Sequence, residues 1–316
     1  MFEKVSKEYP VIAWFSGGIA SAVEVYVCIC LFGIENIRIV FMDTGNEDED
    51  TERFLGDCEK WYGKKIERLT FIGRKYGSIQ DVWRRFNSLN VALGAICSSE
   101  LKRELRMEFQ RNEKYSYQAH GFDITESKRA IGMSLNYADS NPIYPLMMMG
   151  LQKKDLFKIV QDAGIRPPRV YEFGFHNNNC FKTGCVQGGV GYWQKMGREF
   201  PEKFDAMAKV EHKLTDRKGK PVTMLKEQSK KGEEVKKVFL KPHPDYPDVK
   251  DISMMNGREP KPLMECNGFC GLDDLNTPDK TALEELNFDS EEVVSEIKVQ
   301  DNPVVKDSIY TQSKLF

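Results

Sequence analysis

Residues 11–21 read VIAWFSGGIAS and decide the fold of this 316-residue chain. The apolar residues 11–15 are typical of a buried strand, and the apolar stretch 20–32 is typical of a helix. Between them, Gly17 and Gly18 let the backbone turn sharply and approach a ligand closely. The N-terminus of the following helix offers unpaired N–H groups and the positive end of the helix dipole. The stretch therefore predicts a phosphate-binding loop between the first strand and the first helix.

The alternation of strands and helices continues beyond this loop. Such alternation is typical of βαβ units and of a parallel sheet that is covered on both faces. We therefore predict an α/β fold with a Rossmann-like, doubly wound parallel sheet in residues 1–165. The further predicted strands are 37–42, 65–72, 115–121 and a short apolar stretch at 141–148, and the further helices are 48–62, 78–86, 98–110 and 151–163.

Composition limits the remaining classes of protein. The chain has 46 Lys+Arg and 48 Asp+Glu, a net charge of −2, and 41% hydrophobic residues. These values exclude a collagen and a wholly disordered chain. The sequence has no apolar run of the roughly 18–20 residues that a membrane helix needs, and residues 1–10 lack the apolar segment of a signal peptide. We expect a cytoplasmic protein without a membrane partner.

Four segments carry a family resemblance: SGGIAS at 16–21, DTG at 43–45, GFDITESKRA at 121–130 and YPL at 144–146. In this order they resemble motifs of phosphoadenosine-phosphosulfate (PAPS) reductases. That family belongs to the adenine-nucleotide alpha-hydrolase superfamily, together with ATP pyrophosphatases. The similarity spans about residues 8–165. It implies an enzyme, a transferase or an oxidoreductase, that binds ATP or an adenylylated sulfate with Mg²⁺ and acts at the phosphates of the nucleotide.

The same resemblance implies a set of nucleotide-binding residues. The first four hold the phosphates, the next two lie along the nucleoside, and the others close the far side of the pocket, where an arginine faces anionic oxygens. The set comprises Ser16, Gly17, Gly18, Ser21, Asp43, Gly45, Gly121, Glu126, Ser127 and Arg129. The sequence departs from the family pattern at Ala20, where Asp is usual, and at Asp123, where Arg is usual. The family's catalytic cysteine near the C-terminus has no counterpart in residues 307–316.

The eight cysteines divide into three groups. A reducing compartment keeps them as thiols. Two pairs in glycine- and asparagine-rich sequence form a C-x4-C…C-x3-C set. This set suits four thiolate ligands of zinc or of a [4Fe–4S] cluster. A third alternative is that the four cysteines bind no metal. The pairs are Cys180 with Cys185 and Cys266 with Cys270, while Cys28, Cys30 and Cys58 are expected to be buried small side chains. Residues 177–193 also resemble a segment of uncharacterised reductase-like proteins, many of them phage-borne.

The eighth cysteine, Cys97, stands alone before the predicted helix 98–110, for which Ser98 and Ser99 are cap candidates. A helix N-terminus and nearby cations lower the pKa of a thiol. Cys97 is therefore a candidate catalytic nucleophile or persulfide carrier, with packing inside the protein as the alternative. The segment CSSELK also resembles a Cys-Thr-x-x-Leu-Lys element of the family, which makes Lys102 a candidate catalytic residue that contacts phosphate.

The composition changes after residue 165. Residues 166–272 form a Cys/Lys-rich region with one predicted helix, 190–214, and the candidate four-cysteine site. Residues 209–241 hold 11 Lys+Arg against 5 Asp+Glu. Residues 273–316 form an acidic tail that is typical of disordered or loosely packed chain. His120 and His176 are interpreted as structural residues, and His212 and His243 are expected to face solvent.

Three functions fit these features. The first is a PAPS reductase-like enzyme of sulfur metabolism or ATP-dependent sulfur transfer, with a thiol or sulfur donor protein as partner. The second is an ATP-dependent enzyme that modifies a nucleic acid, tRNA or DNA, and holds the strand with the basic segment 209–241; salt-dependent binding is its expected mark. The third is a nucleotide-binding module without turnover, which the residues Ala20 and Asp123 favour.

Overall fold

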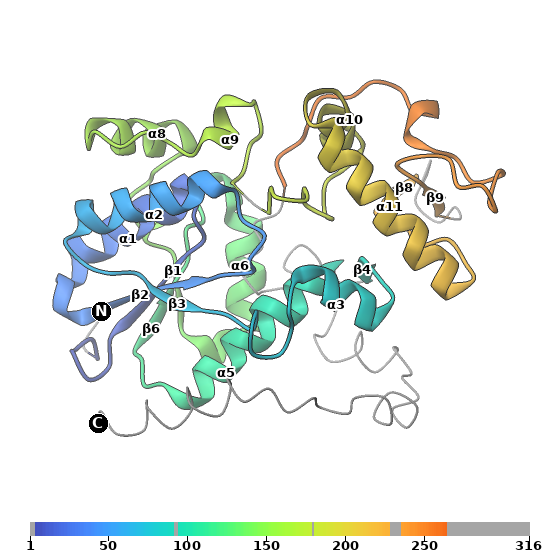
Figure 1. Cartoon of the computed structure of the whole chain (residues 1–316). Helices are drawn as coiled ribbons and strands as arrows, with labels where there is room; N and C mark the ends of the chain where they lie inside the picture. The colour runs from blue at the N-terminus through green and yellow to red at the C-terminus, as the bar shows by residue number, and fades with distance from the viewer. Residues whose placement is uncertain (1–3, 92–93, 179, 228–234, 264–316) are drawn as a thin grey trace. The chain divides into compact units, whose positions relative to one another are not determined.

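The computed structural model describes residues 4–91, 94–178, 180–227 and 235–263. Its central sheet has five strands in the order β3-β2-β1-β6-β7 (Figure 1). All four strand pairs are parallel, which confirms the predicted doubly wound α/β fold. The order reverses at β1, so the crevice beside its carboxyl end is the place where such sheets bind ligands. The strands are β1 (Val11–Phe15), β2 (Ile37–Met42), β3 (Glu67–Leu69), β6 (Tyr117–Ala119) and β7 (Pro142–Ile143).

The central strand β1 is buried on both faces, and its residues are 0–4% exposed. Ile12 and Trp14 belong to one hydrophobic core, and Val11, Ala13 and Phe15 belong to the other. A strand between two helical layers needs apolar side chains on both faces. This requirement explains why its sequence is a continuous apolar run without alternation.

Helices cover both faces of the sheet (Figure 1). Side chains of α1 (Ile19–Phe32), α2 (Glu49–Tyr62) and α8 (Lys153–Asp162) form the core on one face. Side chains of α3 (Ile79–Phe86) and α5 (Glu104–Asn112) join the core on the other face. The second core also contains residues beyond 165, and the boundary predicted there stays a prediction.

Shorter elements complete the described part of the chain. Antiparallel pairing joins β4 with β5 and β8 with β9. In the described ranges we find no helix with the length and apolar character needed to cross a bilayer. The remaining elements are β4 (Asn90–Val91), β5 (Gly94–Ala95), β8 (Leu225–Glu227), β9 (Lys236–Val238), α4 (Ile96–Ser98), α6 (Ser127–Asn136), α7 (Pro145–Met148), α9 (Arg169–Glu172), α10 (Val190–Glu199) and α11 (Pro201–Lys218).

The predicted single helix 190–214 is wrong, because the structure has two helices there. α10 ends at Glu199, and α11 begins at Pro201 after a break at Phe200. Proline has no N–H to donate and its ring clashes with the preceding turn, so it ends one helix and is well suited to begin the next. The position of Pro201 was a signal for this break.

The helix predicted at 98–110 begins two residues earlier, at Ile96. Ala95 is its N-cap residue, and Ser98 and Ser99 lie within the helix rather than capping it. A π-helix, Ser99–Arg103, connects α4 to α5. The early start places the Ile96 side chain in the core, and burial of apolar surface outweighs the preference of serine for caps.

His243 is buried, with 2% exposure, and the prediction that it faces solvent is wrong. Its ring lies 5.3 Å from that of Phe239 and 4.6 Å from that of His212, measured between centroids. Its Nδ1 accepts a hydrogen bond from the Asp245 N–H at 3.2 Å. Packing among aromatic rings buries this imidazole although the surrounding sequence is charged.

Candidate functional site

The glycine loop after β1 is a fixed turn. Gly17 has φ +83°, and a Cβ at this position would lie 2.9 Å from the Thr51 Cγ2, so only glycine fits. The Ser21 hydroxyl accepts a hydrogen bond from the Ser16 N–H at 3.0 Å and donates one to the Gly18 carbonyl at 2.9 Å. These bonds make Ser21 a residue that closes the loop, whereas Ser16 lines a cleft beside it.

Two side chains from residues 169–178 contact the glycine loop. The Tyr171 hydroxyl accepts a hydrogen bond from the Ile19 N–H, the first of α1, at 3.3 Å. The Asn178 amide donates to the Gly17 carbonyl at 2.9 Å and to the Thr51 hydroxyl at 3.0 Å. An oxygen therefore already accepts from the helix N-terminus, the position where a phosphate oxygen would bind.

Ion pairs hold the segment that carries Tyr171. The Arg169 guanidinium donates to both carboxylate oxygens of Asp48, at 2.7 and 3.0 Å. The Arg169 N–H donates to Asp50 at 2.8 Å. The hydrogen bond from Arg53, the Arg169 N–H and the charge of Arg166 hold the pKa of the Asp50 carboxyl well below its usual range, although burial opposes them. The short helix α9 is thereby attached to the N-terminus of α2.

The loop after β2 lies at the same edge of the sheet. Phe15 pairs with Phe41 in the parallel register, so the residues that follow both strands are neighbours. The Asp43 carboxylate accepts a hydrogen bond from the Gly45 N–H at 2.7 Å, and Gly45 has φ +69°. These two predicted nucleotide-binding residues therefore form the turn beside Ser16.

The loop after β6 packs directly on the first turn of α1. A Cβ at Gly121 would lie 3.0 Å from both the Ala20 carbonyl carbon and the Ser21 nitrogen. Because these are backbone atoms, they cannot move aside as a flexible side chain would. Gly121 thus allows the close approach of two loops.

Asp123 has a structural role that the family comparison did not suggest. Its carboxylate accepts a hydrogen bond from the Thr125 N–H at 2.7 Å and caps the short 3-10 helix Ile124–Glu126. Arg129, on α6, pairs with Glu126 and lies over the Phe122 ring, 4.5 Å from its centroid. The negative charge of Asp123 is therefore used at a helix start. Ser127, another of the predicted nucleotide-binding residues, begins α6.

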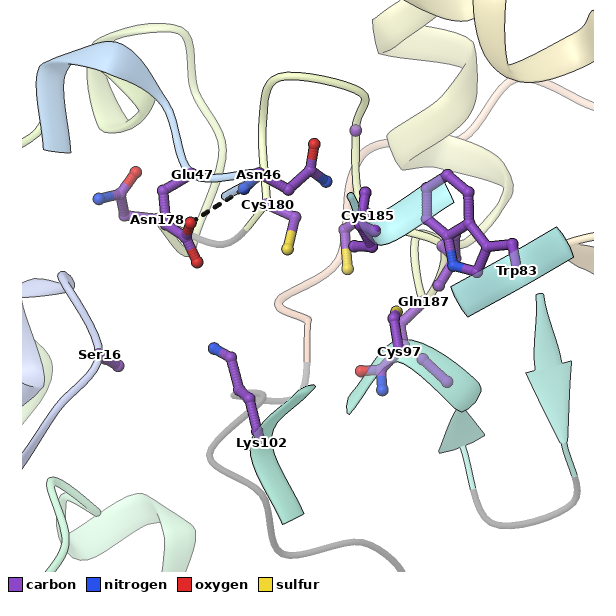
Figure 2. Close-up of a pocket in the computed structure, with 14 residues that line it drawn as sticks. Ser16, Asn46, Glu47, Trp83, Cys97, Lys102, Asn178, Cys180, Cys185 and Gln187 are labelled. Atoms are coloured by element: carbon purple, nitrogen blue, oxygen red, sulfur yellow. Dashed lines mark hydrogen bonds between the residues drawn. The ribbon is translucent and has the colours of Figure 1, made fainter. Parts of the chain in front are cut away.

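A cleft at this edge of the sheet joins Ser16 to three thiols (Figure 2). The sulfur atoms of Cys97, Cys180 and Cys185 face the same cavity. None of the three forms a disulfide bond with another described cysteine. The Thr44 hydroxyl lies 3.6 Å from the Cys180 sulfur. Cys97 is 83 positions from Cys180 along the chain, so no local spacing signals this cluster. Cys266 and Cys270, the other predicted ligands, lie outside the described residues.

An acid and a base also line this cleft. Lys102 is buried and lies on the π-helix, and the Glu47 carboxylate points inward from the loop after β2 (Figure 2). Burial raises the pKa of the Glu47 carboxyl, and the charge of Lys102 and the hydrogen bond from Thr44 at 2.7 Å oppose that shift. The sequence pointed to Lys102 but missed Glu47, whose signal is its place just after the end of a central strand. The further lining residues that sequence reasoning missed include Asn46, Ile79, Trp83, Asn178 and Gln187.

Strand order, glycine loop and cleft together define an open, doubly wound α/β protein with a thiol-lined site at the carboxyl edge of its sheet. No protein-family model matches the chain. The chain is similar to the uncharacterized protein MJ0066 of Methanocaldococcus jannaschii, with 25% identity over 219 residues, which cover 66% of this chain and 42% of the relative. The chain thus spans less than half the length of that relative.

Two solved structures are similar in part. A PAPS reductase from Candida auris, in a phosphate complex, has a TM-score of 0.40 and 10% identity, over 57% of this chain and 90% of that one. An NH3-dependent NAD synthetase from Campylobacter jejuni, in complex with nitrate, has a TM-score of 0.36 and 15% identity, over 67% of this chain and 85% of that one. The fold class rests on the strand order and pairing described above.

Proposed function

We propose that this protein is an enzyme that binds an adenine nucleotide, ATP or an adenylylated sulfate, at residues 16–21 and acts at its phosphates. The observation that carries the proposal is the single cleft in which Ser16 meets three thiols and a buried lysine. A phosphate cradle next to sulfur nucleophiles or metal-bound thiolates suits sulfur transfer or reduction of an activated sulfate. The family resemblance of the motifs supports the same reaction class.

The glycine loop would bind the phosphates through backbone N–H groups at the start of α1. Such groups are fixed before the reaction, so they stabilise charge that develops on phosphate oxygens without reorganising. The Ile19 N–H would be one of these donors once a phosphate oxygen replaces the Tyr171 hydroxyl, which accepts its hydrogen bond at 3.3 Å. Lys102 would supply a positive charge on the thiol side of the phosphates. Mg²⁺ bound with the nucleotide would neutralise further phosphate charge.

The three thiols would serve as metal ligands or as sulfur carriers. Sulfur donors alone, from two separate segments of chain, fit zinc or a [4Fe–4S] cluster. Cys97, Cys180 and Cys185 would hold such a group, and the group would keep them as thiolates. Cys266 and Cys270 remain candidates for a further ligand. Cys97 thus joins the predicted metal set as an alternative to its role as a nucleophile.

Incubation with ATP and Mg²⁺, or with an adenylylated sulfate and a thiol, tests the proposed reaction. We expect release of pyrophosphate from ATP or of sulfite from the adenylylated sulfate, and we expect Ser16→Ala to reduce the rate at least tenfold by removing a cleft hydroxyl. Neither product, with nucleotide binding intact, would favour the module without turnover. Neither product and no nucleotide binding would overturn the proposal.

Metal analysis of Cys97→Ser tests the thiol site. We expect anaerobically purified wild-type protein to contain stoichiometric zinc, or iron with broad visible absorption, and the variant to lose most of that metal because one soft ligand is gone. Cys30→Ser is the matched control, because Cys30 is exposed on α1 and the prediction that it is buried is wrong. Equal metal content in wild type and Cys97→Ser would exclude Cys97 as a ligand.

A further inference from the structure

Four lysines from separate segments gather around the β8–β9 hairpin. Lys218 ends α11 and Lys220 follows it, while Lys226 lies on β8 and Lys237 on β9. Lys226 and Lys237 are direct cross-strand partners in the antiparallel register. We call these four residues the lysine surface. Like charges directly opposite each other on a hairpin repel and destabilise it.

The lysine surface lacks acidic neutralisation in the described part of the chain. No carboxylate in that part lies within ion-pair distance of its four ammonium groups. Glu227, on β8, pairs with Lys250 at 2.8 Å and lies opposite Lys236. Burial, followed by the charges of Lys218, Lys220 and Lys226, lowers the pKa of Lys237. Among the described residues, no ion pair offsets this repulsion.

The lysine surface adjoins the helix that lines the cleft. Lys218 donates a hydrogen bond to the carbonyl of Asn87, the C-cap residue of α3, at 3.2 Å. Arg217 donates to the Arg84 carbonyl on the same helix at 3.0 Å. One turn earlier, Trp83 lines the cleft. Because α3 has eight residues, or about 12 Å of helix, the lysine surface and the cleft lie within the reach of one extended ligand.

We propose that the lysine surface binds the phosphodiester backbone of a nucleic-acid strand whose path leads to the cleft. A row of phosphates would relieve the repulsion among the four ammonium groups. Lysines act as point charges on flexible stems, so they position a backbone without reading its bases. The proposal does not depend on the proposed reaction, because strand binding requires no chemistry in the cleft.

Fluorescence anisotropy with a labelled single strand of roughly 20 nucleotides, as RNA and as DNA of the same sequence, tests the proposal. The wild type is compared with a variant in which Lys218, Lys220, Lys226 and Lys237 are all replaced by Gln. We expect at least tenfold weaker binding at low salt. The slope of log affinity against log salt is negative, and each lost phosphate contact reduces its magnitude by about 0.7, so we expect the magnitude to decrease by about 3.

The matched control replaces four other exposed lysines by Gln, with the same change in net charge. It is expected to bind the strand as the wild type does. The control residues are Lys60, Lys65, Lys154 and Lys158. If the fourfold variant does not fold, Lys226→Gln with Lys237→Gln removes only the cross-strand pair and is still expected to reduce the magnitude of the slope by about 1.4. No strand binding by the wild type, equal loss in the control, or stronger binding to anionic lipid vesicles than to either strand would overturn the proposal.

Discussion

Replacing Gly17 with alanine is expected to weaken ATP binding by about 100-fold. The residue has φ +83°, and the new Cβ would lie 2.9 Å from Thr51 Cγ2, so the loop must shift. A hydrogen bond to a charged group contributes about 1.5–3 kcal/mol, and about 1.4 kcal/mol is a tenfold change in affinity. Loss of one or two phosphate contacts therefore gives the expected decrease, which isothermal titration calorimetry measures.

Gly56→Ala is the matched control for this variant. Gly56 lies within α2, and no atom lies within 4 Å of a Cβ at that position. Alanine is the better helix former, so the control is expected to keep full affinity and to gain about 1 kcal/mol in stability. Folded Gly17→Ala that binds ATP as tightly as the wild type would show that the loop does not contact the phosphates.

Replacing Glu211 with alanine is expected to lower the free energy of unfolding by about 2–6 kcal/mol. Glu211 is fully buried on α11, and its carboxyl accepts hydrogen bonds from the N–H groups of Met224 and Leu240, each at 2.7 Å. Alanine would leave both donors buried without an acceptor, at about 1–3 kcal/mol each. Urea denaturation measures the loss. An unchanged midpoint and slope would show that the hydrogen bonds from Glu211 on α11 to Met224 and Leu240 do not stabilise the fold.

The same carboxyl predicts a pH dependence. Burial raises the pKa of Glu211 from 4.5 to about 8, against the two backbone hydrogen bonds. A folded-state pKa above the unfolded value means that the stabilising contribution is complete below pH 4.5 and is lost as pH rises to 8. In that window the difference in unfolding free energy between the wild type and Glu211→Gln should fall by up to about 1.4 kcal/mol per pH unit. A difference that stays constant from pH 5 to 8 would show that Glu211 is already ionised in the folded protein.

Local sequence patterns predicted most of the sheet and the helices α1, α2 and α8 that cover one of its faces. The apolar run of β1 and the acidic start of α2, capped by Asp48, are signals that lie within a few residues of the structure they produce. The predicted strands 65–72 and 115–121 were longer than β3 and β6. The hydrogen-bonded pairing of each strand ends where its neighbouring strand ends, which the local sequence does not show. Pro201 was a local signal too. The predicted helix 190–214 ran through this proline, although proline interrupts the interior of a helix.

By itself, the sequence determined the doubly wound class and the position of the glycine loop, because strands, turns and helix starts depend on short-range backbone preferences and hydrophobic pattern. Only the tertiary structure decided the composition of the site. It brought Cys97 to Cys180 and Cys185 in one cleft. It also placed Lys226 opposite Lys237. These contacts join residues that are far apart in the sequence, through packing and strand register, so no local sequence pattern predicts them.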